Sequence, residues 1–173
     1  MPHLQPTKPT AKSWSPSPPA IRRLQPGDRP ALAALVSQDG LFTKEEISVA
    51  LELIDGAIAE PGGEYRVMVA DCDGRLAGYI CYGPTPMTEG TWDLYWIATH
   101  PEVRGRGVAR SLVEQMESEL RGIGACHVRV ETSQTEGYGA AHTFYEKMHY
   151  PVVARFPDFY KPGDDLLVMY KRL

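Results

Sequence analysis

Beyond residue 20, the pattern of apolar and polar positions predicts alternating strands and helices. Apolar residues that alternate with polar ones indicate half-buried strands, and apolar residues three or four positions apart indicate amphipathic helices. Strands are predicted at 21–24, 65–70, 76–82, 92–99, 127–132, 152–154 and 166–171. Helices are predicted after Asp28 as far as Gly40, after Thr43 as far as Pro61, from Val108 to a C-cap at Gly122, and from Ala140 to Met148.

Capping and turn residues mark the ends of several of these elements. Asp28 is a candidate helix N-cap with Pro30 in the first helical turn, and Thr43-Lys44-Glu45-Glu46 is a capping-box pattern. Asp71-Cys72-Asp73-Gly74 predicts a tight hairpin turn. The segment 158–165 is expected to be a connection before the last strand.

The order of the elements predicts the fold class. The three strands between residues 65 and 99 form an antiparallel meander, because short turns join them. The helix between the strands at 92–99 and 127–132 makes that pair parallel. The order β-α-α-β-β-β-α-β-α-β-β therefore predicts an α/β (α+β) fold, a mixed sheet with helices on both faces.

The run from Trp92 to Gly122 carries the strongest chemical signal. In its strand, Leu94, Trp96 and Ala98 are expected on one face and Asp93, Tyr95, Ile97 and Thr99 on the other. After His100-Pro101 comes a turn with two glycines and three arginines, and then a helix. Backbone N–H groups of such a turn, with the positive end of the helix dipole behind them, bind a phosphorylated ligand. A pyrophosphate is the expected ligand.

Two common phosphate motifs do not fit this turn. A dinucleotide fingerprint needs G-x-G-x-x-G directly after the strand, whereas Gly105-Arg106-Gly107-Val108-Ala109-Arg110 ends in Arg. The P-loop pattern G-x-x-x-x-G-K-[ST] is absent. The pattern [Q/R]-x-x-G-x-[G/A] fits at Arg104, Gly107 and Ala109, and resembles the acetyl-CoA signature of the Gcn5-related N-acetyltransferases, the GNAT superfamily. The alternative is an ordinary Gly-rich loop with surface arginines.

The resemblance extends from about residue 20 to the C-terminus. It implies the GNAT fold, with a mostly antiparallel, seven-stranded sheet. It also implies that acetyl-CoA is a co-substrate and that backbone groups of the central strand pair with its pantetheine arm. The residues expected to bind the coenzyme are Ile97, Ala98, Thr99, Arg104, Gly105, Arg106, Gly107, Val108, Ala109, Arg110 and Tyr145.

A second stretch, from Ala141 to Tyr150, looks like the family's A-x-x-F-Y-x-x-x-G-[FY] element. By resemblance, Tyr145 donates a proton to the departing thiolate; the alternative is an aromatic residue that only packs its helix. Two residues depart from the pattern. His149 replaces the usual Gly, which requires a local adjustment at a position where a positive φ is expected. Tyr138 stands where many members have Asn.

Acyl transfer to an amine also needs a neutral amine, and a free amine is mostly protonated at pH 7. Glu131 is the first candidate for the base and Asp93 the second, with His142 a further one; a solvated strand-end carboxylate is the simpler alternative for both acids. Tyr95, Glu131 and Tyr160 are the residues expected to bind the acceptor.

The C-terminal stretch from Asp158 to Asp165 resembles the D-[FY]-Y-x-x-G-[DE]-D element of members that acetylate α-amines. The alternative is a hairpin connection with ordinary turn residues. The expected function is therefore an N-acetyltransferase acting by direct attack on the α-amine of a small amino acid, such as alanine, or of a peptide N-terminus. An acyl-CoA-binding sensor with little catalysis and an enzyme using a longer acyl donor stay open.

Composition and charge bear on the number of domains and on which classes of protein and site are excluded. At 173 residues with 43% hydrophobic content, the chain is expected to form one globular domain at 21–173 after a flexible, Pro-rich arm at 1–20. Trp14 is the one residue of the arm that could dock on another part of the protein; the alternative is a loose tail. A net charge of −4 argues against nucleic-acid binding, and no apolar run is long enough for a membrane span. Three cysteines without C-x-x-C spacing argue against a zinc site or disulfide scaffold, so no metal is expected. A cytoplasmic monomer or homodimer is expected.

Overall fold

The computed structural model describes residue 14 and residues 17–38, 42–135 and 139–173. The predicted order of elements is confirmed. The strands are β1 Ala20–Arg23, β2 Arg66–Cys72, β3 Arg75–Pro84, β4 Thr91–Thr99, β5 His127–Ser133, β6 Val152–Lys161 and β7 Asp164–Arg172. The helices are α1 Arg29–Val36, α2 Lys44–Ala59, α3 Val108–Gly122 and α4 Gly139–Lys147, with short 3-10 turns η1 Pro26–Asp28 and η2 Pro101–Val103.

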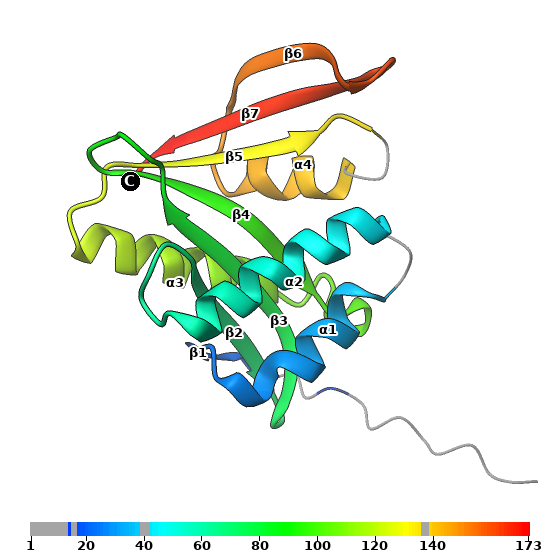
Figure 1. The fold of residues 1–173 in the computed structure, drawn as a ribbon, viewed down its shortest axis with the longest axis vertical. Coiled ribbons are helices and arrows are strands. Elements are labelled where there is room, and N and C mark those ends of the chain that lie inside the picture. The colour runs from blue at the N-terminus through cyan, green and yellow to red at the C-terminus, as the bar shows by residue number, and fades with distance from the viewer. Residues whose placement is uncertain (1–13, 15–16, 39–41, 136–138) are drawn as a thin grey trace, which may run out of the picture.

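The strands form one mixed sheet in the order β1-β2-β3-β4-β5-β7-β6. Every neighbouring pair is antiparallel except β4 and β5, which are parallel as predicted. Helices α1 and α2 cover one face and α3 and α4 cover the other, as Figure 1 shows. The core is therefore divided into two apolar clusters, one on each side of the sheet.

A β-bulge in the central strand changes which residues face which cluster. Cys81 of β3 lies opposite Trp96 and Tyr82 lies opposite Leu94, so Tyr95 is the extra residue. The prediction that Leu94, Trp96 and Ala98 share a face is wrong. Leu94 packs with α3, whereas Trp96 and Ala98 pack with α1 and α2. Side chains of a strand alternate with a period of two, so one extra residue moves all later side chains to the opposite face.

The start of α2 follows the predicted capping box. The Glu46 N–H donates to Thr43 Oγ1 at 3.1 Å, and the Thr43 N–H donates to Glu46 Oε2 at 2.7 Å. Each residue satisfies one backbone donor that has no partner within the helix. This cap fixes the first turn of α2, and that turn faces the site described below.

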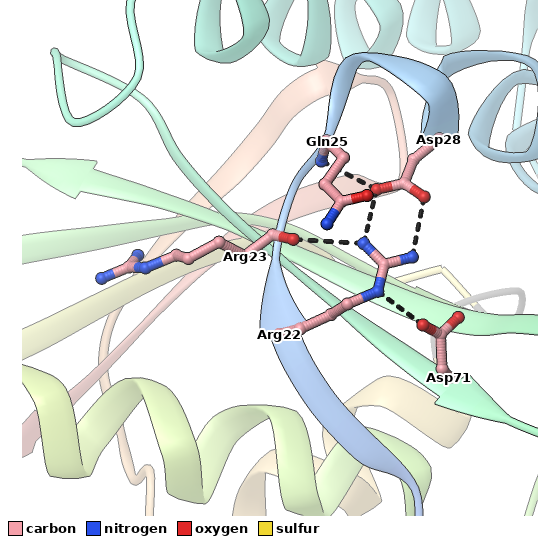
Figure 2. Close-up of polar contacts among 5 residues, drawn as sticks. All are labelled: Arg22, Arg23, Gln25, Asp28 and Asp71. Carbon is pink, nitrogen blue, oxygen red and sulfur yellow. Dashed lines mark hydrogen bonds and ion pairs between the residues drawn. The ribbon is translucent and has the colours of Figure 1, made fainter. Parts of the chain in front are cut away.

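Asp28 has a role different from the predicted one. It precedes α1, but its side chain accepts no hydrogen bond from the helix. Figure 2 shows that its carboxylate instead holds both terminal nitrogens of Arg22, at 2.7 and 2.8 Å, and accepts from the Gln25 N–H at 2.8 Å. Arg22 Nε also donates to Asp71 of β2 at 2.5 Å. The Arg22 guanidinium thus joins β1 to η1 through a bidentate pair with Asp28 and to β2 through Asp71.

The last two strands are longer than predicted. β6 continues to Lys161 and β7 begins at Asp164, so the expected connection at 158–165 shortens to two residues. Pro157 and a left-handed Asp158, with φ 54°, interrupt the pairing of β6 with β7. Both features are unusual within a strand, so the sequence pattern did not predict the full length of this edge strand.

Two left-handed residues close the helices that flank β5. α3 includes Gly122 and its C-cap is Ile123, so the predicted C-cap is one residue too early; the residue with positive φ, Gly124 at 79°, follows the C-cap. After α4, His149 has φ 63°. The positive φ expected at this position, where the family pattern has Gly, is confirmed. Most residues with a side chain are strained in this conformation.

Candidate functional site

The parallel strands β4 and β5 pair over only part of their length. Within the described residues, their pairing ends at Leu94 opposite Val130, although β5 continues beside β7 to its last residue, Ser133. The bulge at Tyr95 lies where the pairing ends, and a bulge bends its strand. The two strands therefore diverge (Figure 1), and residues 97–99 of β4 keep an edge that β5 does not cover.

The predicted phosphate turn lies between this end of β4 and the start of α3. Gly105 and Gly107 have φ values of 76° and 82°, in the left-handed region that glycine adopts without strain. A Cβ at either position would meet no atom within 4 Å. Gly107 is the N-cap of α3, so the first N–H groups of the helix and the positive end of its dipole lie at the turn. This arrangement favours an anion.

The three arginines of the turn are exposed and have different surroundings. Arg110 lies 3.2 Å from Glu114, one helical turn further along α3. Arg106 donates from Nη1 to the carbonyl oxygen of Trp14 at 3.1 Å. Val108, at the first position of α3, is buried and anchors the turn in the core.

Trp14 is docked on the domain. Its side chain is 7% exposed and belongs to the core cluster beneath α3. The indole N–H donates to Glu102 Oε2 at 2.8 Å, and the guanidinium of Arg75 lies 3.8 Å from the centre of the ring. Residues 1–13 and 15–16 of the predicted arm lie outside the described residues, and its last residue, Ala20, is the first of β1.

A cavity of about 600 Å³ opens where β4 and β5 diverge. It is lined from α2, β4, β5, α4 and the β6–β7 hairpin by Phe42, Thr43, Glu46, Tyr95, Trp96, Ile97, Val130, Glu131, Thr132, Ser133, Thr135, Ala141, Tyr145, Tyr160, Lys161 and Asp164. It brings together Tyr95, Glu131 and Tyr160, predicted for the acceptor, with Ile97 and Tyr145, predicted for the coenzyme. The turn at 104–110 does not line it.

Tyr145 is the buried residue of α4, with 4% of its surface exposed. Its ring contacts those of Phe144 and Tyr150, at centroid distances of 5.3 and 5.9 Å. Burial raises the pKa of its hydroxyl above the usual value, so the phenol keeps its proton at neutral pH. Tyr145 therefore both packs the core and lines the cavity as a protonated hydroxyl.

The candidate bases have contrasting environments. The Glu131 side chain is 46% exposed, lines the cavity, and lies 3.4 Å from Arg129. Asp93 is buried, accepts a hydrogen bond from Arg129 Nε at 2.6 Å, and is not among the residues that line the cavity. His142 donates from Nε2 to the carbonyl oxygen of Ser133 at 2.7 Å. Of the three, only Glu131 borders the open space.

The acidic residues of the β6–β7 hairpin have two different kinds of surroundings. Asp158 Oδ1 accepts from the Gly163 N–H at 2.6 Å, and Asp165 Oδ1 accepts from the Asp158 N–H at 2.9 Å, so both hold the hairpin. Asp164 instead lines the cavity beside Tyr160 and accepts from Ser133 Oγ at 2.5 Å. Asp158 and Asp165 thus behave as hairpin residues, whereas Asp164 borders the cavity.

Aromatic rings of Phe42, Tyr95 and Trp96 form part of the cavity wall. Phe42 meets Trp96 edge to face at a centroid distance of 5.2 Å, and Tyr95 meets Tyr65 at 5.6 Å. Burial, followed by the charge of Asp93, raises the pKa of Tyr95 to about 12. These rings stay neutral at physiological pH.

Sequence reasoning missed the contribution of Phe42, Thr43 and Glu46. The capping box located the start of α2 correctly, and that start borders the cavity. A capping signal is local, and it does not tell which part of the sheet the helix end will face. Tyr138, which departs from the family pattern, lies outside the described residues.

Neither a metal centre nor a membrane span is found in the part of the chain that the structure describes. Its His, Cys, Asp and Glu side chains form no group of three or more able to hold a metal ion. None of its helices has the length and apolar character needed to cross a bilayer.

A family model and two curated relatives match this chain. The family model of the acetyltransferase (GNAT) domain matches residues 63–151. The chain is 30% identical over 104 residues to an uncharacterized N-acetyltransferase of Methanocaldococcus jannaschii, which covers 60% of this chain and 64% of that protein. A second curated relative, an acetyltransferase of Pectobacterium atrosepticum, is 31% identical and is covered over 57% of its length. The chain thus spans less than two thirds of each.

Solved structures agree with the family model. A crystal structure from Desulfovibrio desulfuricans, described as an acetyltransferase of the GNAT family, has 36% sequence identity and a TM-score of 0.85, with 89% of this chain and 98% of that chain covered. The ribosomal-protein-S18-alanine N-acetyltransferase of Escherichia coli shares the fold, with 20% identity, a TM-score of 0.70, and 89% and 93% covered. The divergence of β4 from β5, the turn before α3 and these matches together show that the chain belongs to the GNAT acetyltransferase family.

Proposed function

We propose that this protein transfers the acetyl group of acetyl-CoA to a primary amine in the cavity between β4 and β5. One observation carries the proposal: the uncovered edge of β4 at 97–99 leads directly from the cavity to an anion-favouring turn. An elongated ligand with a phosphorylated end and a reactive end fits such a path. The turn receives the pyrophosphate, the β4 edge pairs with the pantetheine arm, and the thioester lies in the cavity.

The transfer needs one nucleophile and two proton movements. The neutral amine attacks the thioester carbonyl carbon, the new C–N bond forms, and the C–S bond then breaks. Tyr145 gives its proton to the departing thiolate, because burial keeps the phenol protonated. An N–H group of the β4 edge polarises the thioester carbonyl oxygen as negative charge develops there.

Glu131 takes the proton that the amine must lose. It is the carboxylate among the candidate bases that borders the cavity, and its exposure lets water relay the proton. Asp93 serves instead to fix Arg129, which lies 2.6 Å from Asp93 and 3.4 Å from Glu131. Arg129 thereby orients the base.

The charge of the cavity favours the α-amine of a polypeptide over a free amino acid. Three carboxylates, Glu46, Glu131 and Asp164, lie on its wall with one cationic side chain, Lys161, so the wall carries a net negative charge that attracts an ammonium group. A free amino acid would bring its own carboxylate into the same acidic surroundings, whereas a peptide N-terminus carries an amide there. Like charges about 5 Å apart repel by roughly 3 kcal/mol at an effective dielectric constant of about 20.

Exposed aromatic residues continue from the cavity along β6. Phe156 and Phe159 are 51% and 60% exposed, and Phe159 meets the ring of Tyr160, which lines the cavity, at 5.1 Å. This row gives apolar side chains of an acceptor peptide a surface beyond the reacting amine. The E. coli relative, whose name gives ribosomal-protein-S18 alanine as its acceptor, makes a peptide that begins with alanine the first to test.

The test is release of free coenzyme A thiol from acetyl-CoA in the presence of an amine. We expect turnover with an alanine-initiated peptide, little with free alanine, and none with the same peptide already acetylated at its N-terminus. Tyr145→Phe should lower kcat by about a hundredfold or more with coenzyme binding retained. If the wild type binds acetyl-CoA but releases no thiol with any amine, the protein is an acyl-CoA-binding module and the proposal fails.

A further inference from the structure

The contacts of Trp14 reach both sides of the phosphate turn. Before Gly105, the indole N–H donates to Glu102 at 2.8 Å and the ring lies 5.1 Å from that of His100. After Gly105, the Trp14 carbonyl accepts from Arg106 at 3.1 Å. A single residue, far away in the sequence, therefore contacts the turn at Arg106 and the segment just before it at His100 and Glu102.

We propose that Trp14 is a positioning residue for coenzyme binding, holding the turn in the shape that receives the phosphates. The inference rests on the proposed function, because it assumes that acetyl-CoA binds at this turn. Trp14 itself touches neither the reacting atoms nor the cavity between β4 and β5. Its effect is transmitted through Glu102 and Arg106.

The turn needs such support because its own backbone is permissive. Residues 104–107 are exposed, and two of them are left-handed glycines, which restrict the backbone less than other residues do. Ordering them on binding lowers affinity by the conformational entropy lost. Contacts that fix the turn beforehand reduce that loss, and fixing Glu102 and Arg106 restrains the backbone on either side of Gly105.

Charge gives Trp14 a second effect. Glu102 lies two residues before Arg104, and its carboxylate would repel a pyrophosphate. The indole N–H holds Glu102 Oε2 beside Trp14, and the Arg75 guanidinium lies over the same ring. Hydrogen bonds to a carboxylate are stronger than those between neutral groups. Loss of the indole donor should free the carboxylate as well as loosen the turn.

Trp92 provides a matched control. It is 8% exposed, belongs to the same core cluster, and has the guanidinium of Arg66 at 4.6 Å from its ring. It lies at the opposite end of β4, about 25 Å from the turn at ~3.3 Å per residue. Trp92→Phe therefore perturbs a comparable buried tryptophan without touching the turn.

The experiment is a double-mutant cycle on the full chain, with acetyl-CoA binding measured by calorimetry. Trp14→Phe keeps most of the ring but removes the donor, and we expect about tenfold weaker binding. In a Glu102→Ala background the same substitution should change affinity by less than about twofold, because the acceptor is already absent. In acetyl transfer, Trp14→Phe should raise KM for acetyl-CoA, with kcat and KM for the amine unchanged.

Three results would overturn the inference: unchanged affinity in Trp14→Phe, equal weakening in Trp92→Phe, or equal weakening with and without Glu102. Thermal unfolding of each variant shows that the compared proteins are folded. A wild type that binds no acetyl-CoA contradicts this inference and the proposed function together. A wild type that binds it, with the expected cycle, but acetylates no amine contradicts only the proposed function.

Discussion

Replacement of Gly107 by Asp tests the phosphate turn most directly. Gly107 has φ 82° and Gly124, at the opposite end of α3, has φ 79°, and a Cβ at either position meets no atom within 4 Å. Asp at each site therefore carries the same backbone strain, about 1 kcal/mol, without a clash. Gly124→Asp is a matched control that lies roughly 25 Å away along a helix that rises ~1.5 Å per residue.

Gly107→Asp should be more stable than Gly124→Asp but should bind the coenzyme more weakly. A carboxylate near the N-terminus of α3 is favourable by about 0.3–1 kcal/mol, and one near the C-terminus is unfavourable by a similar amount. Gly107→Asp should thus be the more stable variant. For coenzyme, a carboxylate ~5 Å from a phosphate repels it by about 3 kcal/mol at an effective dielectric constant near 20, or roughly a hundredfold in affinity.

Calorimetry with acetyl-CoA and thermal unfolding would measure both quantities. Gly107→Asn, which has the size of Asp without its charge, separates repulsion from strain, and we expect it to bind far more tightly than Gly107→Asp. The reasoning is refuted if Gly107→Asp binds acetyl-CoA within about threefold of Gly124→Asp. Such a result would mean that no phosphate lies at this turn.

Three further predictions concern other parts of the chain. Glu131→Gln should lower kcat by about a hundredfold or more with unchanged acetyl-CoA affinity; an undiminished kcat would remove Glu131 from the role of base. Thr43→Ala should destabilise the protein by about 1 kcal/mol, or 2–4 °C in Tm, because one half of the capping box is lost; an unchanged Tm would contradict this. The hydrogen bonds from Arg22 lower the pKa of Asp28 below its ordinary value of 3.8, so its contribution to stability is present above that value and is lost as pH falls through the folded-state pKa. Asp28→Asn should therefore be less stable than the wild type at pH 7, with the difference shrinking below pH ~4; a difference independent of pH would refute the linkage.

The sequence by itself determined the features that are local. The β2–β3 hairpin, the Thr43–Glu46 cap and the Asp73-Gly74 turn depend on residues a few positions apart, and each is found where it was predicted. The turn at 104–110 was predictable for the same reason, because two glycines, three arginines and a helix start lie together in the chain. The parallel pairing of β4 and β5 followed from the helix between them.

Tertiary structure decided the rest, because its contacts join residues far apart in the sequence. The bulge at Tyr95 depends on the register with β3, and it reverses the faces of Trp96 and Ala98. The cavity gathers walls from five elements, whose packing no periodicity records. Trp14 lies 88 residues from Glu102, within a Pro-rich segment that predicts a loose arm. Its burial depends on partners that only the folded domain brings together.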